Sequence, residues 1–376
     1  MFSKTEKERR HGAIRQILDS EDLNALLLIG DANLGFDFCG DLRYYSNNRT
    51  IVYREVIVVF RNSEPALFTT TTRKLEEIAA RSFMSDIRFS DDVVADVITV
   101  LKERGVSSGR IGVNLEMLSM AWNKLFKEAL PEIEWVETHE SMMQVRRKHS
   151  DEEADVFRKG AALGDGSFEA ALKAIRPGAS QFEIVAELEH YSRSRGAEEH
   201  FTLIGSAKFS FSTGTNIIFY YPTHRRLEVG DSLLMEITPR YEGYWTQLVR
   251  AVNVGKPNED LAKIQTVCRD AIKRGLEQFK PGNRIKDVVL AMESSVSGSQ
   301  FQLKPPLGHI TGVDMIEGRV SPRNETLLTP GMAVIIHPTV FTSDGRNWTF
   351  CGETYLVTAG GYERLHHTDD QLITQN

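Results

Sequence analysis

Apolar and polar positions follow two different patterns along the chain, and these patterns divide it into two parts. In the first 145 residues, short apolar runs typical of buried strands stand between segments of helical periodicity. Strands that alternate with helices predict an α/β unit with a largely buried mixed sheet. The expected strands are Ala25–Gly30, Ile51–Phe60, Ala66–Thr70 and Arg110–Asn114, and the expected helices are residues 6–19, Arg73–Ser82 and Val93–Arg104.

From residue 146 onward, long helices are expected first and strands afterwards. Ser150 and Glu153 have capping-box spacing at the start of a helix that ends near Ile175, and a second helix is expected from Gln181 to about Arg195. The pattern predicts an α+β domain, so we expect two domains, residues 1–145 and 146–376. Its expected strands are Phe201–Gly205, Leu233–Pro239, Tyr244–Val254, Met332–Phe341 and Glu353–Thr358, with helices at Glu259–Phe279 and Ile285–Ser295.

Composition excludes several classes of function. The 376 residues are 41% hydrophobic and 26% charged, with a net charge of −7, so no basic field is present to bind nucleic acid. The three cysteines, Cys39, Cys268 and Cys351, are too few and too widely spaced for a disulfide framework. No apolar run approaches a membrane span, and the charged N-terminal segment does not read as a secretory signal. We therefore expect a cytoplasmic protein without a membrane anchor.

Eight short segments carry a further signal because they stand in a meaningful order along the chain. They are Asp41–Tyr45, Met143–Glu153, Ile175–Gly178 with Gln181–Glu187, Leu227–Met235, Gly243–Thr246, Leu307–Val313, Leu328–Met332 and Tyr355–Thr358. Together they resemble the creatinase, aminopeptidase P and prolidase family over nearly the whole chain. The resemblance implies an α/β N-terminal domain followed by an α+β domain of the pita-bread fold. It also implies a homodimer, as in many relatives, and a small-molecule substrate.

The resemblance also shows what this chain lacks. In the family's metallopeptidases, two Asp, one His and two Glu hold a pair of metal ions. Carried over by position, these ligands fall on Glu236, Gln247, His309, His337 and Gly352, the last beside Glu353. Only His309 is unchanged. The neutral amide of Gln247 replaces a bridging carboxylate, so we expect no dinuclear metal site.

Creatinase works without metal, and residues 236–251 look more like creatinase than like a peptidase. However, the histidine that creatinase uses as acid and base aligns with Phe219, and its nearby catalytic glutamate aligns with Val249. Creatine hydrolysis is therefore not expected. The resemblance leaves a pita-bread chain whose active site has been rebuilt for another reaction.

The catalytic candidates are His309, His337 and Glu236. A carboxylate inside the apolar run Leu233–Ile237 is costly to bury unless it is paired or used, which favours a site role for Glu236. His366 and His367, near a polar tail, are expected to be exposed. Candidate substrate-binding residues, which could equally be core or surface residues, are Phe219, Tyr220, Tyr221, Gln247, Glu317, Arg319 and Glu353.

Three hypotheses of function remain open on these residues. The first is a metal-independent enzyme that acts on a C–N bond or carboxylate of a small amino-acid-like compound, with the two histidines as acid and base. The second is an enzyme with one Fe or Zn ion, held by His309, His337 and either Glu236 or Glu353. The third is a non-catalytic binding module. Ionisable groups at three of the five ligand positions favour an enzyme over the binding module.

Overall fold

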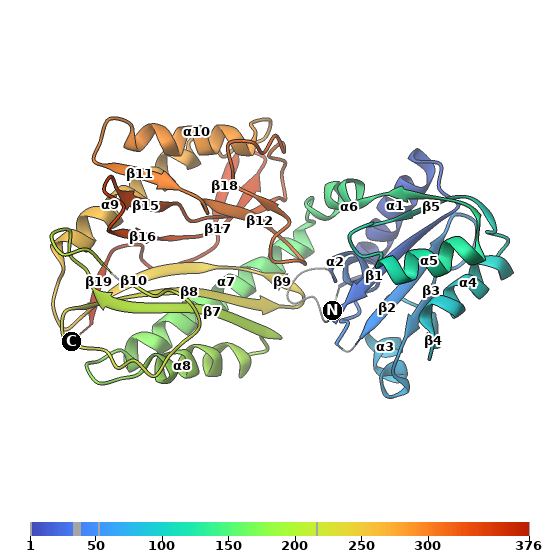
Figure 1. Ribbon diagram of the computed structural model, residues 1–376, viewed down its shortest axis with the longest axis horizontal. Helices are drawn as coiled ribbons and strands as arrows, with labels where there is room; N and C mark the ends of the chain where they lie inside the picture. Colours follow the sequence, from blue (N-terminus) through green and yellow to red (C-terminus); the bar gives the residue numbers. More distant parts are fainter. Residues whose placement is uncertain (1, 33–38, 52, 216, 376) are drawn as a thin grey trace. The chain divides into compact units, whose positions relative to one another are not determined.

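The computed structural model describes residues 2–32, 39–51, 53–215 and 217–375, and the chain forms two compact units (Figure 1). The N-terminal unit extends to Arg147 and includes Val313–Met315. The C-terminal unit comprises Lys148–Gly312 and the chain from Ile316 onward. Within the described residues, no helix is both long and apolar enough to cross a membrane.

The N-terminal unit is built on a six-stranded sheet in the order β4-β3-β2-β1-β5-β6. Strand β2 is antiparallel to both of its neighbours, and the other pairs are parallel. The sheet is therefore mixed, as the sequence predicts. Its strands are β1 (Ala25–Asp31), β2 (Arg54–Phe60), β3 (Ala66–Thr69), β4 (Asp86–Phe89), β5 (Ser108–Val113) and β6 (Glu132–Glu137).

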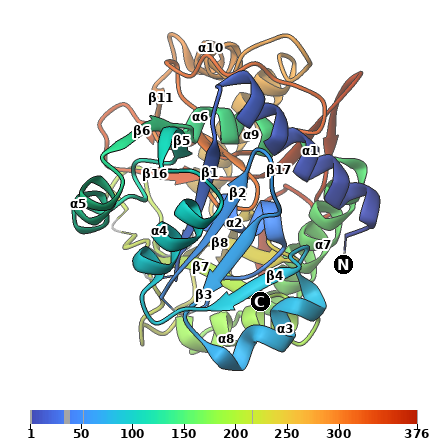
Figure 2. The same ribbon diagram turned by 90° about the vertical axis from the view of Figure 1, so that its right-hand side faces the viewer.

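Helices cover both faces of this sheet because its central strands are apolar on both faces. Along β1, Leu27 and Ile29 pack in one core while Leu26 and Leu28 pack in the other. The first core contains α4 (Val93–Glu103) and α5 (Met120–Ala129), which lie along one side of the strands in Figure 2. The second contains α1 (Lys4–Ser20), α2 (Gly40–Ser46), α3 (Leu75–Arg81, after the short η2, Thr72–Lys74) and α6 (His139–Arg146).

The C-terminal unit contains a ten-stranded sheet whose main path is β13-β12-β14-β17-β10-β8-β7. Strands β18, β19 and β9 pair with β17, β10 and β8, and a separate sheet has the order β11-β15-β16. The bounds are β7 (Glu199–Lys208), β8 (Asp231–Tyr241), β9 (Tyr244–Trp245), β10 (Leu248–Val254), β11 (Phe301–Lys304), β12 (Gly308–Thr311), β13 (Gly318–Arg319), β14 (Ala333–Ile336), β15 (Thr339–Thr342), β16 (Trp348–Phe350), β17 (Gly352–Thr358), β18 (Gly361–Arg364) and β19 (Ile373–Gln375).

Two helix pairs pack on these strands: α7 (Asp151–Ala174) with α8 (Gln181–Arg193), and α9 (Glu259–Leu276) with α10 (Ile285–Val296). The first pair shares a core with Met235, Ile237 and Leu248 of β8 and β10. Helix α7 begins with the predicted capping box, in which Ser150 accepts from the N–H of Glu153 and Glu153 accepts from that of Ser150. These helices leave the opposite face of β8 and β10 for the site.

Two strands expected to be continuous are each broken in two. Tyr244–Val254 forms β9 and β10, because the N–H of Gln247 is bound by the Thr354 hydroxyl at 2.8 Å instead of joining the ladder. Met332–Phe341 forms β14 and β15, which belong to different sheets. This break falls at His337 and Pro338, where proline has no N–H to donate. Both breaks lie at candidate site residues.

Candidate active site

One row of paired residues crosses three neighbouring strands of the C-terminal sheet. Glu236 on β8 pairs with Val249 on β10, and Val249 pairs with Gly352 on β17. Paired residues point to the same face of a sheet, and this row faces away from α7 and α8. Two strand spacings separate Glu236 from Gly352, about 10 Å. The apolar Val249 and the bare Gly352 therefore form a floor beside the carboxyl group.

His309 and His337 lie close together near the Gly352 end of this row. His309 is on β12, paired with Ile335 of β14, and His337 follows the last residue of β14. The two imidazole rings are 5.7 Å apart between centroids and nearly perpendicular. Both residues are buried. The backbone thus brings together two histidines that are 28 positions apart in the sequence.

Gly352 is packed directly against His337. A Cβ placed on Gly352 would lie 2.6 Å from both Cα and Cβ of His337, and it would also clash with the carbonyl oxygen of Ile336. The position that carries a glutamate in the family's metallopeptidases therefore has no room for any side chain here. The two substitutions, histidine at 337 and glycine at 352, fit each other.

Gln247 links the break in the β9–β10 segment to the histidines. Its Oε1 lies 3.4 Å from Nε2 of His309, while its buried Nε2 has no hydrogen-bond partner in the described part of the chain. Its backbone is held by Thr354, whose hydroxyl accepts from the Gln247 N–H at 2.8 Å and donates to the Gln247 carbonyl at 3.2 Å. Thr354 had no signal in the sequence, because its role depends on a residue 107 positions away.

The pKa of the Glu236 carboxyl group lies near neutral pH. Some of its surface stays accessible, but the group is densely surrounded by protein, and this desolvation raises its pKa to about 7. Burial lowers the pKa of His337 to about 3, with a smaller contribution from the neighbouring His309. At pH 7 His337 is therefore neutral, whereas both forms of Glu236 are populated. The Nδ1 atom of His337 has no hydrogen-bond partner among the described residues.

The predicted aromatic group divides into two parts. The ring centroids of Phe219 and Phe350 are 5.2 Å apart, and those of Phe350 and His337 are 5.6 Å apart. Phe219 therefore belongs to the aromatic side chains that surround the histidines. Tyr220 and Tyr221 are 62% and 51% exposed, and their rings pack against each other with centroids 4.8 Å apart. Phe219 is thus the one of the three that the structure links to the site.

Glu353 lies on the other face of the sheet, away from the row. Successive residues of a strand point to opposite faces, so Glu353 points away from Gly352 and Thr354. Its carboxylate accepts from Nη2 of Arg250 at 2.5 Å and is also bound by Nε and Nη2 of Arg364. The assignment of Glu353 to substrate or metal binding is wrong for this geometry, because its oxygens already bind two guanidinium groups.

The remaining predicted residues occupy different environments. Glu317 is buried and packs over Gly312, and its N–H donates to the carbonyl of Ile310. Arg319 is exposed but pairs in register with His309, so the two side chains share a face. The expectation that His366 is exposed is wrong. Its Nδ1 lies 3.2 Å from the Asp165 carboxylate of α7 in a buried contact.

The donor set does not fit the metal centre of the family's peptidases. The five ligand positions hold a carboxyl group, an amide, two imidazoles and a glycine with no room for a side chain. Across the described ranges, no three His, Cys, Asp or Glu side chains are grouped so that they could hold a metal ion. The expected set of two histidines with Glu236 or Glu353 is therefore not assembled.

Comparisons with known proteins agree with this fold. The Creatinase/Prolidase N-terminal domain family matches residues 10–148, and Metallopeptidase family M24 matches residues 155–361. A creatinase from Bacillus sp. (strain B-0618) is 27% identical over 395 residues, covering 100% of this chain and 90% of that protein.

Solved structures show the same fold. An Xaa-Pro dipeptidase from Bacillus anthracis has a TM-score of 0.82 at 22% identity, covering 98% of this chain and 99% of its own. An X-Pro aminopeptidase from Thermotoga maritima MSB8 has a TM-score of 0.83 at 20% identity, covering 97% and 99%.

The fold is thus the two-domain pita-bread fold, as the sequence predicts. The chain belongs to the creatinase, aminopeptidase P and prolidase family, whose named members above are peptidases and a creatinase.

Proposed function

We propose that this protein is a hydrolase that cleaves a C–N bond of a small amino-acid-like compound without a dinuclear metal centre. The observation that carries the proposal is the row from Glu236 to Gly352 with His337 packed at its far end. A carboxyl group with a pKa near 7 and two imidazoles border an apolar floor about 10 Å long. Reactive groups on a surface of this length suit a small molecule.

Glu236 is the proton-transfer group in this proposal. An acid or base works best when its pKa is near the working pH, and the raised pKa of Glu236 meets that condition. As a carboxylate it takes a proton from an attacking water, and as a carboxylic acid it returns that proton to the leaving nitrogen. His337, neutral at pH 7, accepts a hydrogen bond from substrate or water through its unpartnered Nδ1.

Gln247 and His309 act as a second pair. If Nε2 of His309 donates to Oε1 of Gln247, the amide nitrogen of Gln247 is left as a donor for which the described part of the chain provides no acceptor. A buried donor without a partner costs about 1–3 kcal/mol, which a substrate carbonyl oxygen would recover. We assign Gln247 to binding the oxygen on which charge develops in the transition state.

We also propose that the protein is a homodimer in the cytoplasm. Ile218, Tyr220 and Tyr221 form an exposed apolar group close in sequence to Phe219, and a second copy of the chain would cover it. Cys268 and Cys351 are thiols buried in the core and form no disulfide, which suits a reducing compartment. Sedimentation that shows a monomer at micromolar concentration would contradict the dimer.

The function is tested on chelator-treated protein with a panel of N-substituted amino acids, ureido acids and small amides, scored by release of amine or ammonia. Turnover and melting temperature are measured on the same samples. We expect Glu236→Gln, His309→Asn and His337→Asn each to lower kcat/KM by ~10²- to 10⁴-fold while the proteins remain folded. Glu187→Gln, an exposed carboxylate on α8, is the matched control. Variants that melt early but keep their specific activity would overturn the catalytic assignment.

A further inference from the structure

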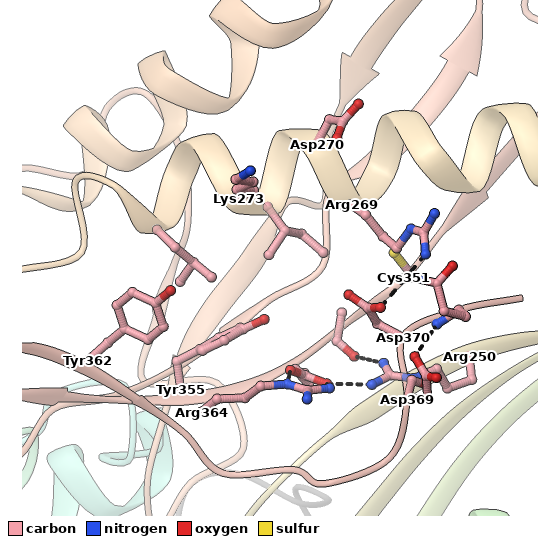
Figure 3. A pocket seen from close by; sticks show the side chains of 15 residues that line it. Arg250, Arg269, Asp270, Lys273, Cys351, Tyr355, Tyr362, Arg364, Asp369 and Asp370 are labelled. Atoms are coloured by element: carbon pink, nitrogen blue, oxygen red, sulfur yellow. Dashed lines mark hydrogen bonds and ion pairs between the residues drawn. The ribbon is translucent and has the colours of Figure 1, made fainter.

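Figure 3 shows a cavity of about 430 Å³ from close by. Glu353 and its partners Arg250 and Arg364 line it, so it lies on the face of the sheet opposite the catalytic row. Helix α9, strands β17 and β18 and residues 369–371 surround it. Glu353 and Gly352 of β17 line the bottom of the cavity, and Gly352 also packs against His337. Strand β17 therefore lies between the cavity and His337. The volume is within the range of small-molecule sites in proteins.

At the bottom of the cavity, the positive charges around Glu353 outnumber its one negative charge. Glu353 is bound by both Arg250 and Arg364, so two guanidinium groups share one carboxylate. The Arg250 guanidinium is held in place by the protein, because it also donates to the carbonyls of Val249, Gly352, Thr368 and Asp369. Arg364 differs, since 39% of its side chain remains exposed. Arg364 therefore retains accessible surface for a second anion.

Two more cations reach the cavity from α9. Arg269 and Lys273 are four residues apart and so lie on the same face of the helix. The buried Nη1 of Arg269 has no hydrogen-bond partner among the described residues, and its ion-pair partner Asp370 lies 3.7 Å away, which is too long for a hydrogen bond. Together with Arg364, these side chains can bind a carboxylate.

The remaining lining balances this charge and adds an apolar end. Four basic side chains face four acidic ones, so the cavity as a whole is neutral. The acidic side chains are Asp270, Glu353, Asp369 and Asp370, and three of these are exposed. The apolar end is formed by Tyr355, Tyr362, Ile272 and Leu276, with the two tyrosine rings 5.8 Å apart. A ligand with charges of only one sign would pair with the four side chains of opposite charge and leave the other four side chains without a ligand partner.

We propose that this cavity is a second binding site, for a zwitterionic α-amino acid with an apolar side chain. Its carboxylate lies between Arg269, Lys273 and Arg364, and its ammonium group faces Asp369 and Asp370. Its side chain packs on Tyr362 and Leu276. The proposal does not depend on the catalytic assignment, because it concerns binding on the other face of the sheet.

Calorimetric titration with L-leucine tests the proposal without any measurement of turnover. We expect saturable binding of one equivalent. Leucinamide, which lacks the carboxylate, and N-acetyl-leucine, which lacks the ammonium group, should each bind at least ~10-fold more weakly, because each lacks one of the charged groups that the cavity binds. Equal binding of all three compounds, or no binding of L-leucine at about 20 mM, would overturn the proposal.

Variants locate the binding in this cavity. Lys273→Gln and Arg269→Gln should each weaken L-leucine binding by ~10-fold or more. Lys263→Gln is the matched control, because Lys263 is an exposed residue of the same helix that does not line the cavity. If Arg269→Gln lowers the melting temperature, Lys273→Gln still decides the matter, since Lys273 is exposed. Unchanged affinity in Lys273→Gln would place any L-leucine binding elsewhere.

Discussion

Gly352 and His337 fit against each other so closely that a single methyl group on Gly352 would overlap the His337 backbone. In the family's metallopeptidases both positions carry glutamate, and here a side chain at 352 is excluded by the residue at 337. We expect Gly352→Ala to lower the free energy of unfolding by about 1–3 kcal/mol through overpacking and to displace the His337 ring. Gly360→Ala should have little effect, because an added Cβ would have no described atom within 4 Å apart from those of its chain neighbours. Equal stability of the two variants would contradict the close packing.

Glu236 should make stability and activity change in opposite directions with pH. Its pKa is raised in the folded protein, so between its ordinary value and about 7 the folded state binds more protons than the unfolded state. Stability is therefore lost as pH rises through this window, while the ionised form needed for catalysis is gained. We expect Glu236→Gln to be about 1–2 kcal/mol more stable than the wild type at pH 8.5, after allowing for partial exposure, while its kcat/KM is strongly reduced. Urea unfolding of both proteins at pH 5 and pH 8.5 measures this difference in the free energy of unfolding. The same difference at both pH values would contradict the raised pKa.

The apolar run Leu233–Ile237 predicted the strand that carries Glu236, and the carboxylate inside this run predicted a site role for that residue. The sequence did not predict the face on which Glu353 lies. Both residues stand in strands next to small or apolar neighbours, and only the pairing of β17 with β10 shows that Gly352, not Glu353, faces the row. A shift of one residue in an alignment moves a side chain to the other face of a sheet, so resemblance by position could not separate these two.

His366 shows a second limit of sequence reasoning. Its neighbours are polar, which predicts exposure, yet the segment packs against Asp165, 201 residues earlier in the chain. The same limit applies to the breaks at Gln247 and His337. Local patterns describe the strands well, but partners that are distant in sequence decide where strands break and which polar residues become buried.

The contact of Asp165 with residues 366–368 should be important for stability. Asp165 accepts from the N–H of His367 at 2.8 Å and the hydroxyl of Thr368 at 2.6 Å, besides the contact with His366. Burial alone would raise its pKa, but these bonds lower it below the ordinary value, so their contribution is present at neutral pH and is lost on acidification. We expect Asp165→Asn to cost about 2–3 kcal/mol at pH 7.

Asp155→Asn is the matched control for that measurement. Asp155 lies on the same helix and pairs with Arg158 at the surface, where an ion pair contributes at most about 1 kcal/mol. If the two variants unfold at the same urea concentration at pH 7, the buried contact does not hold the C-terminal segment.

Metal content should separate this chain from the peptidases of its family if the proposed function is right. Because the described donors do not form a dinuclear site, protein purified with Mn²⁺ and then dialysed should retain well below two equivalents per chain by elemental analysis. Removal of metal with a chelator should leave both melting temperature and turnover unchanged. Two tightly held equivalents would contradict the donor set proposed here, whereas one equivalent that is required for turnover would restore the mononuclear hypothesis.

Thr354 should act on catalysis through Gln247 without contacting the substrate itself. Its hydroxyl both accepts from and donates to the Gln247 backbone, and this fixes the amide beside His309. Thr354→Val keeps the shape but removes both bonds, so we expect kcat to fall by up to ~100-fold, the scale expected for a displacement of about 1 Å. Thr354→Ser keeps the hydroxyl and should restore most of kcat. A residue needed only for packing would show the reverse order, because valine fills the buried space better than serine; serine slower than valine would therefore refute the positioning role.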